Sequence, residues 1–190
     1  MDAGLELAGP IETERLVLRP FRESDLDAVL AMQSSPEVAR YLYWGPRTEA
    51  EALEALGKKI AARAIHADGD ALSLAGVLKT TGALVADVVL WLASEQHRLG
   101  EIGYIVPPEH RGRGYATEAT SPLLHIAFKD LGLHRVIGRV EARNVGSARV
   151  LEKAGYCLEG TLRQSVIKNG HVLDQWMYAI LRHEVPAGSA

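Results

Sequence analysis

The stretch EIGYIVPPEHRGRGYATEA, residues 101–119, decides how this chain folds. Its first six residues, 101–106, form an apolar strand, and the two prolines that follow end it because proline lacks the N–H of a sheet ladder. Gly112 and Gly114 then allow backbone angles that other residues resist. A helix is expected from about 116 to 131, so a strand leads through a glycine-rich loop into a helix.

The start of this helix is suited to binding an anion. The first turn of a helix has N–H groups without intrahelical partners and a partial positive charge, and this combination favours phosphate. Arg111 and Arg113 add full positive charges. No lysine follows Gly114, which excludes a Walker loop, and Thr117 stands where a dinucleotide fingerprint needs a third glycine or alanine. A plain turn with solvated arginines is the alternative that this loop leaves open.

Short strands and helices lie on both sides of this stretch. Further strands are expected over 15–20, 71–78, 83–92, 135–142, 157–167 and 171–181, the last two joined by Asn169-Gly170, a strong hairpin signal. Helices are expected after Ser24, from about 36, over 48–67 and over about 146–154. Mostly hairpin connections, with one crossover helix, predict a mixed α/β (α+β) fold.

The composition is that of a soluble globular protein. The chain has 190 residues, 47% hydrophobic and 24% charged, with a formal net charge of −3. We therefore expect a single domain over residues 1–190, with its core at about 13–182 and its last residues, Pro186 to Ala190, frayed. Cys157 is the only cysteine, which excludes a disulfide scaffold. The sequence pI of about 6.2 argues against a nucleic-acid partner.

The location of the protein follows from what the sequence lacks. The N-terminus is acidic, and the nearly uncharged run 72–92 is interrupted by polar residues. Neither pattern is that of a signal peptide or a membrane span. We therefore expect a cytoplasmic protein with no membrane partner.

The charges are distributed unevenly along the chain. Residues 1–96 hold 9 basic and 15 acidic side chains, and residues 97–190 hold 12 basic and 9 acidic ones. The basic excess suggests an anionic ligand on the C-terminal half. Chance scatter on a solvated surface is the alternative.

The motif Arg111-x-x-Gly114-x-Ala116 is similar to the acyl-CoA pyrophosphate loop of the GNAT N-acetyltransferases. Four other segments resemble, in a consistent order, the first strand, fourth strand, second cofactor segment and last strand of the RimJ/RimL-like branch: 14–19, 101–104, Asn144-x-x-Ser147 with 151–156, and Asp174-x-x-x-Tyr178-Ala179. The resemblance covers about residues 13–182. It implies the GNAT fold, a central mixed, mostly antiparallel sheet of about 6–7 strands flanked by helices.

The resemblance implies acetyl-CoA as the acyl donor and no metal. The strand end at 105–106 would pair with the pantetheine arm, the loop would hold the pyrophosphate, and Asn144 would bond the arm. Lys153 would reach the phosphates, or it is a solvated helix lysine. The implied cofactor-binding residues are Ile105, Val106, Arg111, Gly112, Arg113, Gly114, Tyr115, Ala116, Thr117, Asn144, Ser147 and Lys153.

Direct transfer to an amine needs a base, because an ammonium has no lone pair for attack. The resemblance makes Glu101 the first candidate, and the alternative is a glutamate paired with an arginine. His97 and Asp87 are weaker candidates. Ser147 would protonate the departing thiolate, or it caps a helix start.

Other residues carry weaker hypotheses. Tyr178 is a second possible proton donor or a core aromatic, and Cys157 is expected as a small buried hydrophobe. Tyr41, Tyr43 and Trp44 would line an acceptor pocket or close the core at a bend. The histidines show no metal-binding spacing.

The resemblance thus implies an N-acetyltransferase that acts on a primary amine. The amine is either a protein N-terminal α-amine or that of a small molecule. Two alternatives stay open: a non-catalytic module that senses acyl-CoA, and an N-acyltransferase using another donor such as succinyl-CoA. A homodimer also stays open.

Overall fold

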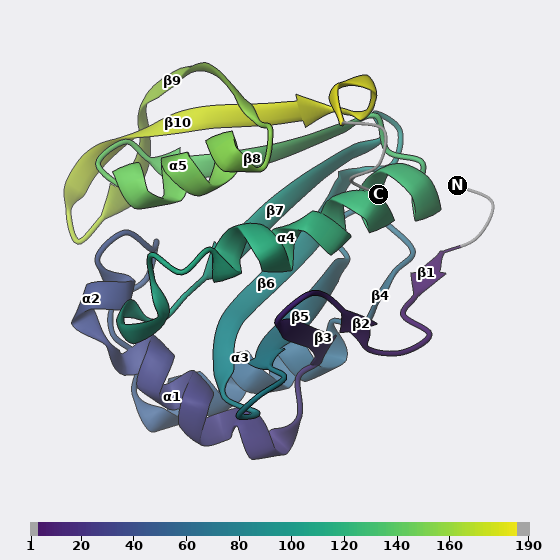
Figure 1. The fold of residues 1–190 in the computed structure, drawn as a ribbon. Helices are drawn as coiled ribbons and strands as arrows, with labels where there is room; N and C mark the ends of the chain where they lie inside the picture. Colours follow the sequence, from purple (N-terminus) through teal and green to yellow (C-terminus); the bar gives the residue numbers. More distant parts are fainter. Residues whose placement is uncertain (1–3, 186–190) are drawn as a thin grey trace.

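The computed structural model describes residues 4–185, so the fraying expected for Pro186 to Ala190 concerns residues outside this range. Within residues 4–185 an eight-stranded sheet runs through the middle of the molecule (Figure 1). In spatial order its strands are β2 (Ile11–Glu12), β3 (Leu16–Pro20), β5 (Ala71–Leu78), β6 (Leu84–Ser94), β7 (Leu99–Ile105), β8 (Arg135–Glu141), β10 (His171–Leu181) and β9 (Cys157–Lys168). Neighbours are antiparallel except β7 and β8. The predicted mixed, mostly antiparallel sheet is confirmed.

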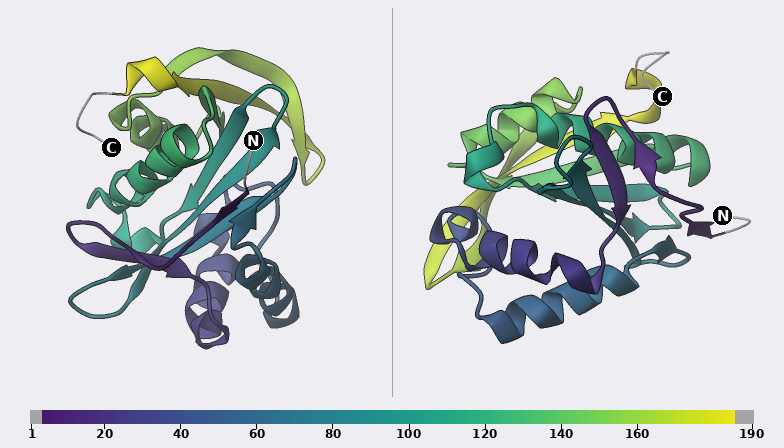
Figure 2. Two further views of the ribbon diagram at one scale, coloured as in Figure 1. Left: turned by 90° about the vertical axis from the view of Figure 1, so that its right-hand side faces the viewer. Right: turned by 60° about the horizontal axis from the view of Figure 1, so that its bottom comes forward.

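Helices cover both faces of this sheet. The α-helices are α1 (Leu26–Ser34), α2 (Pro36–Ala39), α3 (Glu49–Ala61), α4 (Tyr115–His125) and α5 (Val145–Lys153), and short helical turns are η1 (Glu23–Asp25), η2 (Pro108–His110), η3 (Ile126–Asp130) and η4 (Arg182–Glu184). Helices α4 and α5 lie on one face, and α1 and α3 pack together on the other (Figures 1 and 2). Because α4 crosses over the sheet between β7 and β8, these two strands run parallel.

The edge of the sheet near the N-terminus differs from the expectation. Helix α3 ends at Ala61 rather than near residue 67, because residues 64 and 65 form strand β4 (Ala64–Ile65), which pairs with β1 (Leu5–Glu6) in a separate sheet. The side chain of Ile65 is fully buried there, so tertiary packing overrides helix propensity. The two-residue strand β2 also adds to the expected strand number of about 6–7.

The single helix expected over 116–131 forms in two segments. Helix α4 begins after Gly114, whose φ of 81° lies in the left-handed region. After His125 the turns widen, and the N–H of Leu131 donates to the carbonyl of Ile126 at 2.9 Å. This five-residue spacing is that of a π-helix. The left-handed backbone of Gly114 thus ends the loop and begins α4, and the π-helical turn ends the crossover.

Helix α5 lies unusually close to strand β8. A Cβ atom added to Gly138 of β8 would lie 2.8 Å from a methyl carbon of Leu151 on α5. Leu151 belongs to the same buried cluster as Leu123 of α4 and Val136 of β8. The absence of a side chain at residue 138 thus positions α5, which carries Ser147.

Strand β9 is exposed along most of its length because it is the edge strand of the sheet. Cys157 begins this strand and is exposed. The expectation that Cys157 is buried was therefore wrong. In residues 4–185, no helix has the length and apolar character needed to cross a membrane.

Candidate active site

Strands β7 and β8 separate before either of them ends. Their parallel pairing covers three positions and stops where Glu101 faces Ile137. Strand β7 continues to Ile105, and β8 continues to Glu141. The edge of β7 over residues 102–105 therefore has no strand partner on the β8 side, and its backbone is available to an extended ligand.

The loop that follows β7 presents a row of free backbone donors. Gly112 and Gly114 have φ values of 74° and 81°, which turn the chain into α4. In the part of the chain that the structure describes, the N–H groups of residues 112–117 donate to no protein acceptor, and the first helical bond runs from Glu118 to the carbonyl of Gly114. Six donors at a helix N-terminus favour a phosphate group.

Arg15 of β3 holds this loop in place through Glu118. The backbone N–H and the Nε of Arg15 each donate to the Glu118 carboxylate at 2.7 Å, and Thr13 Oγ1 donates to it at 2.7 Å. Arg15 also donates to the carbonyl of Arg113 at 2.9 Å and lies over the ring of Tyr115. Burial alone would raise the pKa of Glu118, but these hydrogen bonds lower it below its usual range. Sequence reasoning missed this clamp.

The two arginines of the loop have different surroundings. Arg111 donates through Nε to the carbonyl of Val106 at 3.1 Å and pairs with Glu37 of α2 at 2.7 Å. Its side chain therefore braces the loop against the strand end and α2. Arg113 is exposed, and within residues 4–185 its guanidinium forms no ion pair, so it is the arginine whose charge is available to a ligand.

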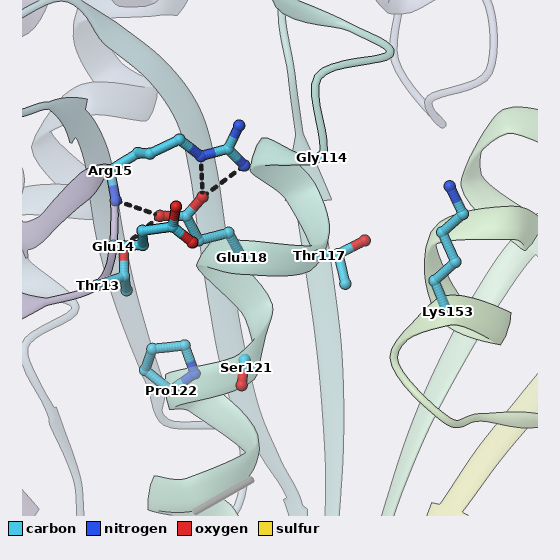
Figure 3. A pocket seen from close by; sticks show the side chains of 9 residues that line it. All are labelled: Thr13, Glu14, Arg15, Gly114, Thr117, Glu118, Ser121, Pro122 and Lys153. Carbon is cyan, nitrogen blue, oxygen red and sulfur yellow. Dashed lines mark hydrogen bonds and ion pairs between the residues drawn. The ribbon is translucent and has the colours of Figure 1, made fainter.

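A pocket of about 520 Å³ lies beside the start of α4 (Figure 3). Gly114 and Thr117 line it from α4, and Lys153 lines it from the end of α5. In Figure 3, Thr117 and Lys153 lie on the α5 side of α4, and the pair of Arg15 and Glu118 lies on the other side. The ammonium of Lys153 therefore borders the same pocket as the free N–H groups.

Ser147 of α5 faces strand β7 across the gap between the separated strands. The hydroxyl of Tyr104 lies 2.8 Å from Ser147 Oγ and donates to the Ser147 carbonyl at 2.7 Å. Asn144 is the N-cap of α5, and its Oδ1 accepts from the Ser147 N–H at 3.1 Å. The alternative that Ser147 caps its helix was therefore wrong, because Ser147 lies one turn too late. Burial strongly raises the pKa of Tyr104.

Tyr178 acts electrostatically on Tyr104, but its own hydrogen bond runs to another residue of α5. Its hydroxyl donates to Glu152 of α5 at 3.0 Å, and its side chain is buried. Burial and the bond to Glu152 raise the pKa of Tyr178. The core-aromatic alternative therefore describes its surroundings in the structure.

Glu101 lies on the opposite face of β7 from Tyr104. Its carboxylate accepts from Nε and from a terminal nitrogen of Arg139 on β8, at 3.0 and 2.5 Å. The alternative that Glu101 pairs with an arginine is therefore confirmed. Glu101 also faces Trp91 across the β6–β7 pair. His97 lies exposed in the β6–β7 turn and Asp87 is buried against Lys59, so neither lies beside this pair.

Tyr43, in the segment after α2, lies near this carboxylate–guanidinium pair. Its hydroxyl contacts the side-chain amide of Gln175 on β10. Burial raises the pKa of Tyr43, and Arg139, Glu101 and Glu141 act on it electrostatically. Tyr41 and Trp44 instead stack against the neighbouring Arg40 and Arg47. Of the three aromatics, Tyr43 is the one placed at the face that carries Glu101.

Several residues of this face escaped sequence reasoning. They come from strands distant in sequence, and they are Arg139, Glu141, Lys168 and Gln175. The sequence did contain a signal for two of them. Side chains alternate between the two faces of a strand, so Arg139 and Glu141 of β8 lie on the same side of the sheet. In the described residues, no cluster of three or more His, Cys, Asp or Glu side chains is arranged to hold a metal ion.

Known proteins share this fold and sequence pattern. Residues 15–156 match the family model described as "Acetyltransferase (GNAT) domain". The chain is 30% identical to "Uncharacterized N-acetyltransferase YnaD" of Bacillus subtilis (92% of this chain and 98% of that protein) and 27% identical to the Escherichia coli K12 protein "Spermidine N(1)-acetyltransferase" (88% and 86%). A solved acetyltransferase (GNAT family) from Bacillus anthracis has a TM-score of 0.83 at 30% identity, over 92% of this chain and 99% of that one.

This chain belongs to the GNAT acetyltransferase family. It is an acyltransferase enzyme, and acetyl-CoA is its acyl donor. The predicted family is confirmed at this level. Its assignment to the RimJ/RimL-like branch and the roles of its individual residues stay predictions.

Proposed function

We propose that this protein transfers the acetyl group of acetyl-CoA directly to a primary amine, in the cytoplasm. The observation that carries the proposal is the row of free N–H groups over residues 112–117, located next to the unpaired edge of β7. The first feature suits a pyrophosphate, and the second suits an extended pantetheine arm. Together they would direct the thioester into the gap between β7 and β8.

The donor would be held by the residues named from the sequence. The N–H groups of residues 112–117 would bind the pyrophosphate, with Arg113 and Lys153 adding positive charge. Ile105 and the N–H of Val106 would meet the arm, because the Val106 carbonyl already accepts from Arg111. Asn144 would act by fixing the start of α5, since its Oδ1 is engaged there.

The acceptor amine would reach the thioester from the face that carries Glu101. The carboxylate of Glu101 would take a proton from the ammonium, and the free amine would then attack the carbonyl carbon. Arg139 would orient Glu101 through its two hydrogen bonds. Tyr43, at the same face, would limit the size of the acceptor.

The leaving thiolate would be protonated from the other side of the gap. The carbon–sulfur bond breaks as the carbon–nitrogen bond forms, so the sulfur leaves with the electron pair. Ser147 Oγ would give it a proton, and would regain one when the nitrogen, positively charged after the attack, releases its second proton through water. The Tyr104 hydroxyl at 2.8 Å would hold Ser147 in position. Burial raises the pKa of Tyr104, so this hydroxyl stays protonated at neutral pH.

The acceptor class follows from the chemistry rather than from any one relative. The E. coli relative is named for spermidine, and the RimJ/RimL resemblance implies protein N-termini. Both acceptors carry a primary amine, and both fit direct transfer. The sequence by itself left open a non-catalytic module and an enzyme with another donor, such as succinyl-CoA, and the same assay tests this protein's activity against both.

The experiment is a thermal-shift screen of acetyl-CoA, succinyl-CoA and CoA, followed by CoA-release assays with an amine panel. The panel contains N-terminal peptides, their N-acetylated forms as blocked controls, spermidine and simple amino compounds. Stabilisation by acetyl-CoA together with amine-dependent CoA release supports the proposal. Tight acetyl-CoA binding without release above the blocked controls overturns it in favour of the sensing module, and faster release from succinyl-CoA overturns the choice of donor.

A further inference from the structure

A second pocket, of about 430 Å³, lies between the β9–β10 hairpin and the end of α2. Arg40, Arg143 and Lys168 line it, together with Asn169 and His171 of the hairpin and two apolar residues of β10. No Asp or Glu is among its described lining residues. The pocket therefore gathers three cations from three separate segments of the chain.

This pocket is held together before any ligand arrives. The Lys168 ammonium donates to the carbonyl of Ala39 and, at 2.7 Å, to that of Arg40, which fixes the hairpin to the end of α2. Arg143 uses its Nε for Glu141, and its two terminal nitrogens have no protein partner within residues 4–185. In the same residues the Arg40 guanidinium has no hydrogen bond or ion pair and lies over the ring of Tyr41, 5.3 Å from its centroid. The pocket thus offers two exposed guanidinium groups with unoccupied donors, on a hairpin and helix end that Lys168 ties together.

The positive charges in this pocket are only partly compensated. Burial lowers the pKa of Lys168, the Arg143 guanidinium lowers it further, and Glu141 opposes the change. Glu141, the acid that opposes this change, is already engaged by Arg143 through its Oε1. A bound anion would relieve the repulsion and could accept charge-assisted hydrogen bonds from two arginines, a geometry that suits carboxylate and phosphate.

The pocket adjoins the proposed acceptor face. Arg139 and Glu141 occupy alternate positions of β8 and point to the same side of the sheet, and Arg143 follows two residues later. Tyr43 is influenced by Glu101, Arg139 and Glu141 together. An acceptor whose amine lies near Glu101 can therefore extend toward Arg143 and Arg40.

We propose that this pocket binds an anionic group, a carboxylate or a phosphate, carried by the amine acceptor. The inference rests on the proposed function, because it assigns the pocket to the acceptor of acetyl transfer. It gives the acceptor a chemical class, a primary amine that also bears a negative charge. A polycation such as spermidine would meet repulsion from three cations in the same place.

The test compares matched pairs of acceptors at saturating acetyl-CoA and constant ionic strength. One pair is O-phosphoethanolamine and ethanolamine, the second is β-alanine and β-alaninamide, and spermidine completes the panel. The wild-type protein should have a kcat/KM at least about tenfold higher for the anionic member of a pair, as expected for one charge-assisted contact. The phosphate and carboxylate pairs show which anion is preferred.

The matched variants are Arg40→Gln and, as a second change at the same pocket, Arg143→Gln. Either should reduce the preference for the anionic member to about threefold or less while leaving the kcat/KM of the neutral amine within about twofold. Lys129→Gln, an exposed cation on η3, is the control and should keep the full preference. Thermal unfolding of each variant shows that the loss does not come from unfolding.

Two outcomes overturn the inference and can be told apart. If neutral amines or spermidine are acetylated as fast as the anionic acceptors, and Arg40→Gln changes nothing, the inference fails and the proposed function stands. If acetyl-CoA binds but no amine in the panel causes release of CoA above the background, the proposed function fails and the inference fails with it.

Discussion

The hydroxyl of Tyr104 lies 2.8 Å from Oγ of Ser147, although the two side chains come from strand β7 and helix α5. The contact crosses the gap that opens where β7 and β8 stop pairing. It gives Ser147 a fixed position and a neighbouring hydroxyl that remains protonated at neutral pH, because burial raises the pKa of Tyr104. A serine so placed can deliver a proton to a sulfur atom bound in the gap.

Replacing Ser147 by Ala should lower kcat by about 10²-fold, the usual contribution of one general acid, while the KM for acetyl-CoA stays within about threefold. Tyr104→Phe should lower kcat by about tenfold, because Ser147 loses only its positioning contact. Steady-state kinetics over both substrates measures this. Ser94→Ala, at the end of β6, removes a hydroxyl that accepts from the backbone N–H of His97 and serves as the control. Full kcat in Ser147→Ala would show that Ser147 has no chemical role.

Glu101→Gln should lower kcat/KM for the amine by about 10²–10³-fold, because an amide of the same size keeps a contact with Arg139 but cannot take a proton. The matched control is Glu159→Gln, since Glu159 accepts from both terminal nitrogens of Arg135 at the other end of β8. Loss of activity in both variants to the same degree would indicate that breaking a carboxylate–guanidinium pair on this strand is the cause, and not loss of a base.

Gly114→Glu should abolish binding of acetyl-CoA measured by calorimetry. The residue has a φ of 81°, where a side chain costs about 1–3 kcal/mol, and a carboxylate there would repel the phosphates. Gly82→Glu is the matched control, because Gly82 has a φ of 72° in a turn with open space around it. It should lose similar stability and keep acetyl-CoA binding. Equal loss of binding in both variants would refute a specific role for the loop.

Glu118→Gln should raise the KM for acetyl-CoA by about tenfold with little change in kcat, because the loop loses its ionic clamp to Arg15 but keeps its N–H donors. Lys79→Met removes the exposed ion pair with Glu12, at 3.0 Å, and should change neither constant, since such pairs contribute little. An unchanged KM in Glu118→Gln would mean that the loop keeps its shape without Arg15.

Asp25→Asn should lower the free energy of unfolding by roughly 3 kcal/mol at neutral pH, the cost of breaking a buried ion pair. Arg19 holds this carboxylate with two bonds of 2.7 Å, and the Arg22 N–H donates at 2.8 Å. Burial alone would raise the pKa of Asp25, but these bonds lower it below its ordinary value of 3.8.

The pH dependence of this effect has a definite sign. Because the folded-state pKa lies below the unfolded one, the stabilisation is present above about pH 3.8 and is lost as the pH falls through the folded-state pKa. Urea unfolding between pH 2 and 7 should therefore show wild type and Asp25→Asn converging at the acid end. Glu54→Gln, in an exposed pair with Lys58, should track wild type at every pH. A constant difference down to pH 2 would contradict the assignment.

The loop, the helix starts and most strands could be predicted from the sequence, because they depend on interactions between residues close together in the chain. The prolines after β7, the glycines at 112 and 114, and the capping residues Ser35 and Thr48 act on neighbouring backbone. Their effect does not need the rest of the fold. Where a distant strand decided the outcome, as at β4, the sequence pattern predicted helix instead.

The surroundings of the site residues were decided by tertiary structure alone. Glu101 meets Arg139 across 38 positions, Arg15 meets Glu118 across 103, and Lys168 meets Arg40 across 128. The unequal charge of the two halves of the chain likewise did not predict where the charges gather in space. Arg40 comes from the acidic half, yet it lies in the basic pocket beside Arg143 and Lys168. Electrostatic interactions depend on distance in space, which the sheet order sets and the linear sequence does not express.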